Sequence, residues 1–292
     1  MMKKVLPFLL LVLLACSCSM ARYARGPESR DIEGLSGYDG IIRTVTYPSS
    51  EPKLSERRMV VYLPKDYYRD SLKRYPVMYL LHGARGNEKT WIDSADVFRC
   101  IDTLRRAGCA ADFILVMPNM NNYRNDRDYK NGRAIPATRA FFTVNGEVER
   151  YFADDVVRRV DSLYRTVARK SGRAIAGMSC GALQTIYLSA NRPELFDYIG
   201  LFSPYTYPTS AAKYHRDVYG GLGWKLKRQF ANPPAFYGIY IGKTDFFYPH
   251  IVLFDQKLTR RGYAHKFVVN PGGHEWYNWS DFLEDFCQEI FR

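Results

Sequence analysis

The C-terminal half of the chain contains a serine, an aspartate and a histidine that together could activate an alcohol. Ser179 has a glycine two residues away on each side, in the segment GMSCG. Asp245 lies in the segment KTDFFY, and His274 lies in NPGGHEWYNW. A serine hydroxyl is a weak nucleophile until a histidine takes its proton and a carboxylate orients the imidazole. These residues therefore predict nucleophilic attack on a carbonyl group, provided that the fold brings them together.

The positions of the histidines and carboxylates single out His274 and Asp245. His274 follows a strand-like segment in a glycine-rich loop, whereas His265 opens that segment and would lie at the opposite edge of a sheet. Asp245 comes directly after an apolar segment, whereas Asp255 falls within a helix-like stretch. The chain order serine, aspartate, histidine is that of the α/β-hydrolase arrangement. We therefore predict Ser179 as nucleophile, Asp245 as acid and His274 as base.

The glycines around Ser179 also allow a plainer interpretation. They could serve only the close packing of a strand, residues 173–177, against the helix predicted for residues 180–193. In that case the serine would merely fit a crowded turn. A sharp strand-to-helix turn would also hold the hydroxyl above the sheet. Because the acid and the base occur at suitable positions as well, we favour the nucleophile.

A second loop could stabilise the oxyanion that forms during acyl transfer. The segment LLHGARGNEKTW places His82 and Ala84 at another predicted strand end. The backbone amides of Ala84 and Cys180, the residue after the nucleophile, are the expected oxyanion donors. We expect His82 to shape this loop rather than to act as a second base.

Strand-like and helix-like segments alternate along the chain. Strands are expected within residues 57–68, 75–83, 112–119, 173–177, 197–204, 236–242 and 265–274, and helices within 96–108, 151–172, 180–193, 250–262 and 281–291. This alternation predicts an α/β fold, with a mainly parallel central sheet and helices on both faces. In such a fold the loops beyond the strand C-termini hold the functional groups.

The first 15 residues predict export. A basic start precedes an apolar stretch that is too short to span a bilayer, which is typical of a signal peptide. The segment LLAC resembles a bacterial lipobox, and this implies cleavage before Cys16 and lipidation of that cysteine. Residues 16–40 are poor in apolar side chains and predict a flexible tether, and residues 41–292 predict the catalytic domain. An ordinary secretory signal is the alternative.

The composition excludes several other classes of protein. The formal net charge is +12, but the basic residues are scattered and no nucleic-acid-binding motif accompanies them, so a solvated basic surface is expected. The cysteines and histidines lack metal-ligand spacing, and no metal or other cofactor is expected. Cys100 and Cys109 flank a helical stretch, and we expect both thiols to be free. The sequence does not indicate an oligomeric state.

Residues 41–292 resemble the esterase D-like α/β hydrolases. The resemblance is carried by YLLHGARGNEKTW, VMPN, RAIAGMSCGA, KTDFFY and PGGHEWYNW, in this order. The group includes feruloyl and acetyl-xylan esterases, S-formylglutathione hydrolases, enterochelin esterases and mycolyltransferases. The resemblance implies the roles given above for the serine, aspartate, histidine and the two amides. Arg85 departs from the family, which often has glycine or a small residue there, and Cys180 replaces a common methionine.

The substrate is expected to be an ester in the bacterial cell envelope. Two long segments, 119–150 and 203–230, leave predicted strands and are rich in polar and aromatic residues, as in binding loops. Candidate substrate contacts are Arg85, Asn119, Tyr205 and Trp276, although such aromatics could equally pack within their own loops. We expect a lipid-anchored serine carboxylesterase, on the periplasmic face or the cell surface, that acts through an acyl-enzyme on feruloyl or acetyl esters of extracellular glycans. An acyltransferase of the same fold and a non-catalytic glycan-binding lipoprotein are the alternatives.

Overall fold

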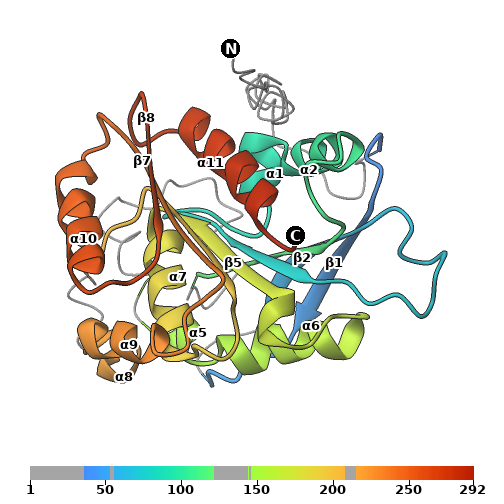
Figure 1. The fold of residues 1–292 in the computed structure, drawn as a ribbon. Helices are drawn as coiled ribbons and strands as arrows, with labels where there is room; N and C mark the ends of the chain where they lie inside the picture. The colour runs from blue at the N-terminus through green and yellow to red at the C-terminus, as the bar shows by residue number, and fades with distance from the viewer. Residues whose placement is uncertain (1–35, 53–55, 122–143, 145, 208–214) are drawn as a thin grey trace, which may run out of the picture.

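A single mixed sheet organises the protein in the computed structural model, which describes residues 36–52, 56–121, 144, 146–207 and 215–292. The eight strands lie in the order β1-β2-β4-β3-β5-β6-β7-β8 (Figure 1). Their bounds are β1 Ile41–Tyr47, β2 Arg57–Leu63, β3 Val77–Leu81, β4 Ile114–Pro118, β5 Arg173–Met178, β6 Tyr198–Phe202, β7 Phe236–Gly242 and β8 Lys266–Asn270. β1 and β2 are antiparallel to their neighbours, and the strands from β4 to β8 are parallel.

The central strands are buried along their whole length. Every residue of β3, β4 and β5 is buried, and these strands read as continuous apolar runs. Such runs suit parallel strands that are covered on both faces, because no side of the strand meets water. The predicted α/β fold with a mainly parallel sheet is therefore confirmed.

Helices cover both faces of the sheet (Figure 1). One face packs against α1 Thr90–Ala95, α2 Val97–Arg106 and α11 Trp276–Glu289. The other packs against α5 Glu147–Arg150, the π-helical turn Ala153–Val157, α6 Arg158–Leu163, α7 Cys180–Asn191, α8 Arg216–Tyr219, α9 Leu222–Gln229 and α10 Tyr248–Arg260. A short 3-10 turn, Lys170–Gly172, precedes β5. Among the helices of the described residues, none is long and apolar enough to cross a membrane.

The helix expected over residues 151–172 ends earlier than its sequence pattern indicates. Helical structure stops at Leu163, and the following backbone is extended and pairs with the segment before β3. The Tyr75 amide donates to the Arg165 carbonyl at 2.9 Å, and the Thr166 hydroxyl donates to Asp161 at 2.6 Å. These bonds compete with further helical turns. Leu163 is consequently 44% exposed instead of lying on the apolar face.

Three smaller features also differ from the expectations. The edge strand β1 was not expected, and the segment 203–230 contains α8 and α9 rather than only loop. Cys100 is not disulfide-bonded, as expected, whereas Cys109 is, so the expectation of two reduced thiols is wrong for Cys109.

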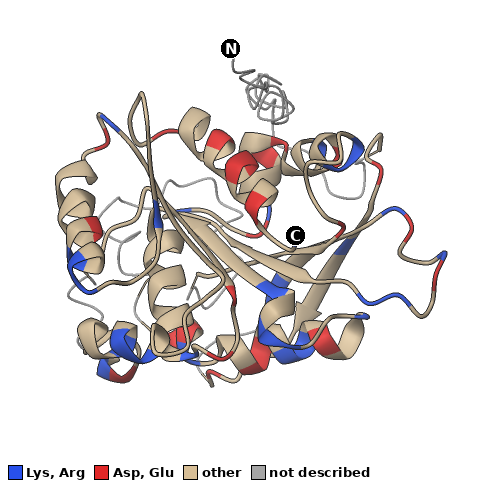
Figure 2. Ribbon diagram, viewed as in Figure 1, with Lys and Arg blue, Asp and Glu red and all other residues tan. Residues whose placement is uncertain are grey.

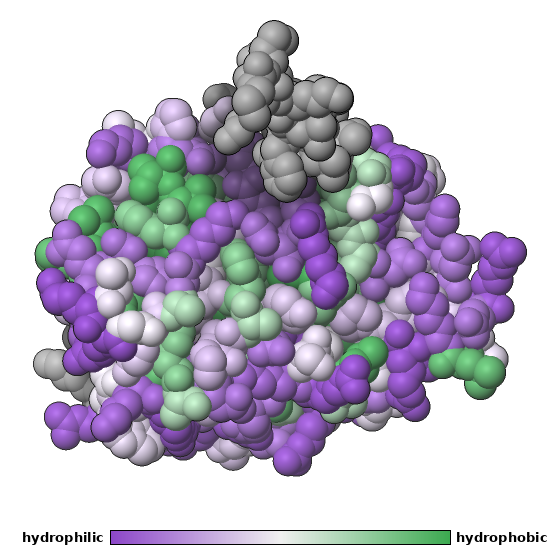
Figure 3. Space-filling model, viewed as in Figure 1, coloured by the Kyte–Doolittle hydropathy of each residue, from purple (hydrophilic) through white to green (hydrophobic). Residues whose placement is uncertain are grey.

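The face of the molecule shown in Figure 3 is mostly polar. Hydrophilic residues cover most of the face shown in Figure 3, and apolar residues gather beside β8 and the start of α11. Basic and acidic side chains are both spread over many elements, and α11 carries several acidic ones (Figure 2). The spread of basic side chains agrees with a solvated surface better than with a single anion-binding face.

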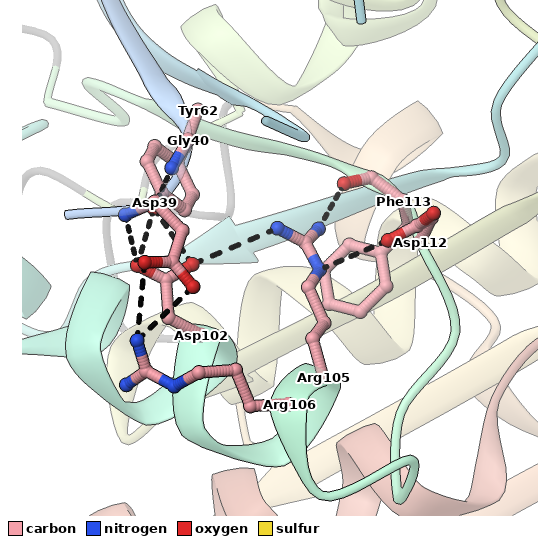
Figure 4. A network of polar contacts seen from close by, with 8 residues as sticks. All are labelled: Asp39, Gly40, Tyr62, Asp102, Arg105, Arg106, Asp112 and Phe113. Atoms are coloured by element: carbon pink, nitrogen blue, oxygen red, sulfur yellow. Dashed lines mark hydrogen bonds and ion pairs between the residues drawn. The ribbon is translucent and has the colours of Figure 1, made fainter. Parts of the chain in front are cut away.

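A polar network fastens the chain that enters β1 to α2 and β2 (Figure 4). The amide of Asp39 donates to Asp102 at 2.8 Å, and the amide of Gly40 donates to the Tyr62 hydroxyl at 2.7 Å. That hydroxyl donates in turn to Asp102 at 2.7 Å. Burial, together with the hydrogen bond to Asp102, raises the pKa of Tyr62. Asp102 is therefore the common acceptor of this network.

Replacing Asp102 should destabilise the fold without changing the residues predicted to be catalytic. In Asp102→Ala the Tyr62 hydroxyl and the Asp39 amide lose their acceptor, and Asp102 is only 2% exposed. We expect a loss of about 3 kcal/mol in the free energy of unfolding, measured by urea titration. The exposed Asp154→Ala should change it by less than about 0.5 kcal/mol. Equal losses of unfolding free energy in the two variants would contradict the proposed contribution of the network to stability.

Candidate active site

Ser179 sits at a sharp turn between β5 and α7. Its backbone has φ 53° and ψ −115°, a conformation that side-chain-bearing residues rarely adopt. A Cβ atom at Gly177 would lie 2.6 Å from the carbonyl carbon of Gly181. A Cβ atom at Gly181 would lie 2.5 Å from the carbonyl oxygen of His82. The two glycines thus serve close packing, and this packing presents the serine hydroxyl above the sheet.

The structure brings Ser179, His274 and Asp245 together, as the sequence indicated. His274 Nε2 lies 2.9 Å from Ser179 Oγ, and His274 Nδ1 lies 2.9 Å from Asp245 Oδ2. Because a carboxylate can only accept at the second contact, Nδ1–H donates to Asp245. Nε2 is then free to accept the proton of the serine hydroxyl. This relay is the geometry that activates a serine for acyl transfer.

The surroundings of Asp245 keep its carboxylate ionised. Burial alone would raise its pKa, but hydrogen bonds from His274 and from the Phe247 amide, at 2.9 Å, outweigh burial and lower the pKa. The Ser203 hydroxyl adds to this lowering. An ionised Asp245 can hold the imidazole in one tautomer and stabilise the imidazolium that forms when Ser179 loses its proton.

Aromatic rings surround the imidazole of His274. The ring centroids of Phe246, Trp279 and Phe247 lie 4.5, 5.0 and 5.4 Å from that of His274. The Trp279 indole also donates to Ser203 Oγ at 3.1 Å, which fixes its orientation. These rings therefore hold the imidazole in position between Ser179 and Asp245.

The two predicted oxyanion amides belong to neighbouring segments. Cys180 begins α7 directly after Ser179, and Ala84 lines the same cavity as the serine. The Ala84 amide lies beside the Cys180 thiol, whose own pKa is raised by burial, so the thiol stays protonated. The Tyr205 hydroxyl lies 3.3 Å from that sulfur. The thiol is thus part of the packing below the loop, and the backbone amides remain the candidate donors.

His82 has a structural environment. Its Nδ1 lies 2.8 Å from the Gly83 carbonyl and donates to it, while Nε2 accepts the Met120 amide at 2.9 Å. Burial lowers the pKa of His82 to about 4, so the ring is neutral around pH 7. It joins the loop after β3 to the loop after β4, as expected from the sequence.

A cavity of about 540 Å³ opens beside Ser179 and His274. Two of the four candidate substrate contacts, Arg85 and Trp276, line it. The other two, Asn119 and Tyr205, are not among the described residues that do so. Most of the segment 119–150, which was expected to be a binding loop, lies outside the described residues (122–143 and 145).

The side chains of Asn119 and Tyr205 are occupied elsewhere. Asn119 donates to Glu88 at 2.9 Å and accepts the Asn121 amide at 3.0 Å. Tyr205 is 6% exposed and stacks on Phe247 with ring centroids 5.0 Å apart. Of the two, only Tyr205 contacts a described residue that lines the cavity, Phe247.

The sequence reasoning missed the aromatic pair Phe246 and Phe247, which line the cavity. Their signal was present, because two aromatics directly after the predicted acid Asp245 must lie near the active site. In the described part of the chain, no group of His, Cys, Asp or Glu side chains could hold a metal ion.

The buried His82 should make stability depend on pH in a defined window. Below its ordinary pKa of 6.5 the unfolded chain binds a proton that the folded chain does not accept until about pH 4. Stability is therefore full above pH 6.5 and falls as the pH drops toward 4, by about 3 kcal/mol from this group.

The variant His82→Gln keeps one donor and one acceptor and removes the titration. Urea unfolding of wild type and variant between pH 4 and 7.5 should show a shallower slope for the variant. Parallel curves for the two proteins would contradict a neutral buried His82.

The comparisons with known proteins agree with this geometry. Residues 50–245 match the family model named Esterase. The "Endo-1,4-beta-xylanase/feruloyl esterase" of Xylanibacter ruminicola is 30% identical over 258 residues, which are 87% of this chain and 32% of that protein. The chain therefore spans about a third of the length of this curated relative.

Solved structures share the fold. A ferulic acid esterase is 23% identical with a TM-score of 0.72, covering 87% of this chain and 100% of that one. The ferulic acid esterase of Anaeromyces mucronatus is 23% identical with a TM-score of 0.69, covering 89% and 93%. The S-formylglutathione hydrolase of Staphylococcus aureus is 19% identical with a TM-score of 0.65, covering 87% and 97%. These structures show the same fold, and the match of residues 50–245 to the family model shows that this chain belongs to the Esterase family, the esterase D-like α/β hydrolases.

Proposed function

We propose that the protein hydrolyses feruloyl or acetyl esters of extracellular glycans through an acyl-enzyme on Ser179. The observation that carries this proposal is the relay from Ser179 through His274 to Asp245, with both contacts at 2.9 Å, beside an open cavity. In this mechanism Ser179 is the nucleophile, His274 the general base and Asp245 the residue that orients it.

Acylation begins when Ser179 Oγ attacks the ester carbonyl carbon. Its proton passes to His274 Nε2, and Asp245 stabilises the resulting imidazolium. The carbonyl oxygen becomes an oxyanion that accepts hydrogen bonds from the backbone amides of Ala84 and Cys180. The bond to the alcohol oxygen then breaks, and the imidazolium returns its proton to the leaving alcohol. The acyl group remains on Ser179.

Deacylation repeats these steps with water. His274 takes a proton from a water molecule, whose oxygen attacks the acyl carbonyl, and the same two amides receive the oxyanion. Collapse of this intermediate releases the carboxylic acid, and His274 returns the proton to Ser179. The reaction therefore needs no cofactor from outside the chain.

The lining of the cavity favours a flat or apolar acyl group. Phe246, Phe247 and Trp276 present aromatic rings there, and such rings stack on phenolic groups or sugar faces. The similar proteins support the same class, because one is named a feruloyl esterase and a solved neighbour contains ferulic acid. The predicted signal peptide supports a substrate outside the cytoplasm.

For the location we propose the bacterial cell envelope. Residues 1–15 and Cys16 lie outside the described residues, and the support is the lipobox-like segment LLAC. A lipid on Cys16 would hold the enzyme on a membrane through the tether of residues 16–40.

Loss of the nucleophile should abolish turnover while leaving the fold intact. We expect Ser179→Ala to lower kcat/KM for short activated esters by at least about a thousandfold, because only binding and the oxyanion amides remain. His274→Ala should lose as much, and the double variant little more, since the two residues act as a unit. The exposed Ser171→Ala is the matched control, and thermal unfolding reports folding.

The acyl-enzyme can be observed directly. Wild type mixed with an activated ester should show a burst of alcohol release and a mass increase of one acyl group, which Ser179→Ala should lack. Wild-type rates in Ser179→Ala would refute the mechanism. Transfer of the acyl group to an added alcohol in preference to water would instead favour an acyltransferase.

The anchoring proposal has its own test. Cys16→Ala should move the protein from the membrane fraction to a soluble or unprocessed form. Ser19→Ala should behave as wild type and controls for a substitution close to Cys16. Unchanged processing and membrane association of Cys16→Ala would favour an ordinary signal peptide and another mode of attachment.

A further inference from the structure

Arg85 has an exceptional place in the active-site cavity. Among the described residues that line this cavity, it alone is a lysine or arginine. It directly follows Ala84, the proposed oxyanion donor, so its Cα atom lies about 3.8 Å from that of Ala84. The Arg85 side chain therefore starts next to the proposed oxyanion site and lines the same cavity as Ser179, so its guanidinium can reach an ester that is bound there.

The guanidinium of Arg85 is not used by the fold. Within the described part of the chain, no hydrogen bond or ion pair joins it to another residue. Nearby arginines behave differently, since Arg57 donates to the Asn119 carbonyl at 2.6 Å and Arg99 pairs with Asp96 at 2.9 Å. The exposed cation is thus available to a ligand.

The backbone conformation of Arg85 also supports a role toward the ligand. Its φ is 63°, in the left-handed region that glycine adopts freely and other residues occupy at a cost. Gly83 and Gly86 lie close by in the same loop, so glycine is common in this segment. The positive φ belongs to a turn in which the Gly86 amide donates to the Gly83 carbonyl at 3.1 Å, with Arg85 as the third residue. This turn would accept glycine more easily than arginine, and among the described residues the fold gains no contact from the arginine side chain. A role toward the substrate accounts for arginine at this position.

No other charged group at the cavity forms an ion pair with Arg85 in the described part of the chain, so its positive charge can act on a ligand. Asp93 is the one carboxylate among the described lining residues, and no ion pair joins it to Arg85. Asp93 has an interaction of its own. His274 faces Asp245, which lies beneath it and is 3% exposed. The formal net charge of +12 also favours the approach of anions.

We propose that Arg85 selects esters that carry a carboxylate close to the scissile bond. The carboxylate can belong to the acyl group, as in a monoester of a dicarboxylic acid, or to the alcohol, as in a uronate residue of an acidic glycan. This inference rests on the proposed esterase function and refines its substrate class. A guanidinium at a partly exposed rim should contribute about tenfold to kcat/KM for such esters.

The experiment compares matched charged and neutral esters. The acyl arm uses mono-para-nitrophenyl glutarate and para-nitrophenyl butyrate, and the alcohol arm uses para-acetoxybenzoate and para-acetoxybenzamide. For Arg85→Gln we expect kcat/KM to fall about tenfold for the charged ester of one arm and less than about twofold for its neutral partner. The arm that responds identifies the side of the ester that carries the carboxylate. Added salt should reduce the wild-type preference.

Two control variants separate the effect of the Arg85 charge from effects of backbone strain and of overall charge. Arg85→Gly relieves the positive φ, so it should unfold at a temperature no lower than wild type and yet lose the preference for charged esters. Arg158→Gln removes an exposed positive charge that does not line the cavity, and it should keep the wild-type preference.

The outcomes separate this inference from the proposed function. An equal fall for charged and neutral esters, or no change for either, would overturn the inference while turnover of neutral esters upholds the esterase. A wild type that turns over none of the four esters would overturn the esterase proposal and this inference with it.

Discussion

The close approach of the β5–α7 turn to the loop after β3 is the constraint on which the site depends. Gly177 and Gly181 let the two segments touch, because any side chain at Gly181 would meet the His82 carbonyl oxygen at 2.5 Å. This contact puts Ser179 into its strained conformation and sets the Ala84 amide beside the start of α7. His82 then ties the same loop to Met120 at 2.9 Å. Nucleophile and oxyanion loop are therefore positioned by one packing contact rather than by two independent loops.

The acid and the base are coupled in a comparable way. The amide of Lys243 donates to the Asn270 carbonyl at 2.8 Å, and the amide of Thr244 donates to the Gly272 carbonyl at 2.8 Å. These bonds continue the pairing of β7 with β8 beyond the strand ends, so they join the loops that carry Asp245 and His274. The sheet thereby sets the distance between the Asp245 carboxylate and the His274 imidazole. Catalytic groups that are held in place before the substrate binds lower the barrier to reaction.

The sequence predicted the features that depend on a local residue pattern. It did not predict those in which contacts with distant segments override the local pattern. Continuous apolar runs predicted β3 and β5, and turn chemistry predicted the place of Ser179. The end of the helix at Leu163 was not predictable, since it results from pairing with a distant segment at Tyr75. The burial of Tyr205 behind the site likewise depends on Phe247, which its own sequence neighbours do not reveal.

Backbone strain is concentrated where the chemistry is proposed. Of the five non-glycine residues with positive φ in the described chain, Ser179, Ser203 and Arg85 lie at or beside the site. Each is held by different means. Ser179 is held by glycine packing, and Ser203 by bonds from its amide to the Tyr240 carbonyl at 2.8 Å and from the Trp279 indole at 3.1 Å. Arg85 is held by the turn in which the Gly86 amide donates to the Gly83 carbonyl at 3.1 Å, and in the described chain its side chain makes no bond of its own. The surrounding structure thus imposes the strained backbone at all three positions, whereas the guanidinium, which the fold does not use, points to the ligand.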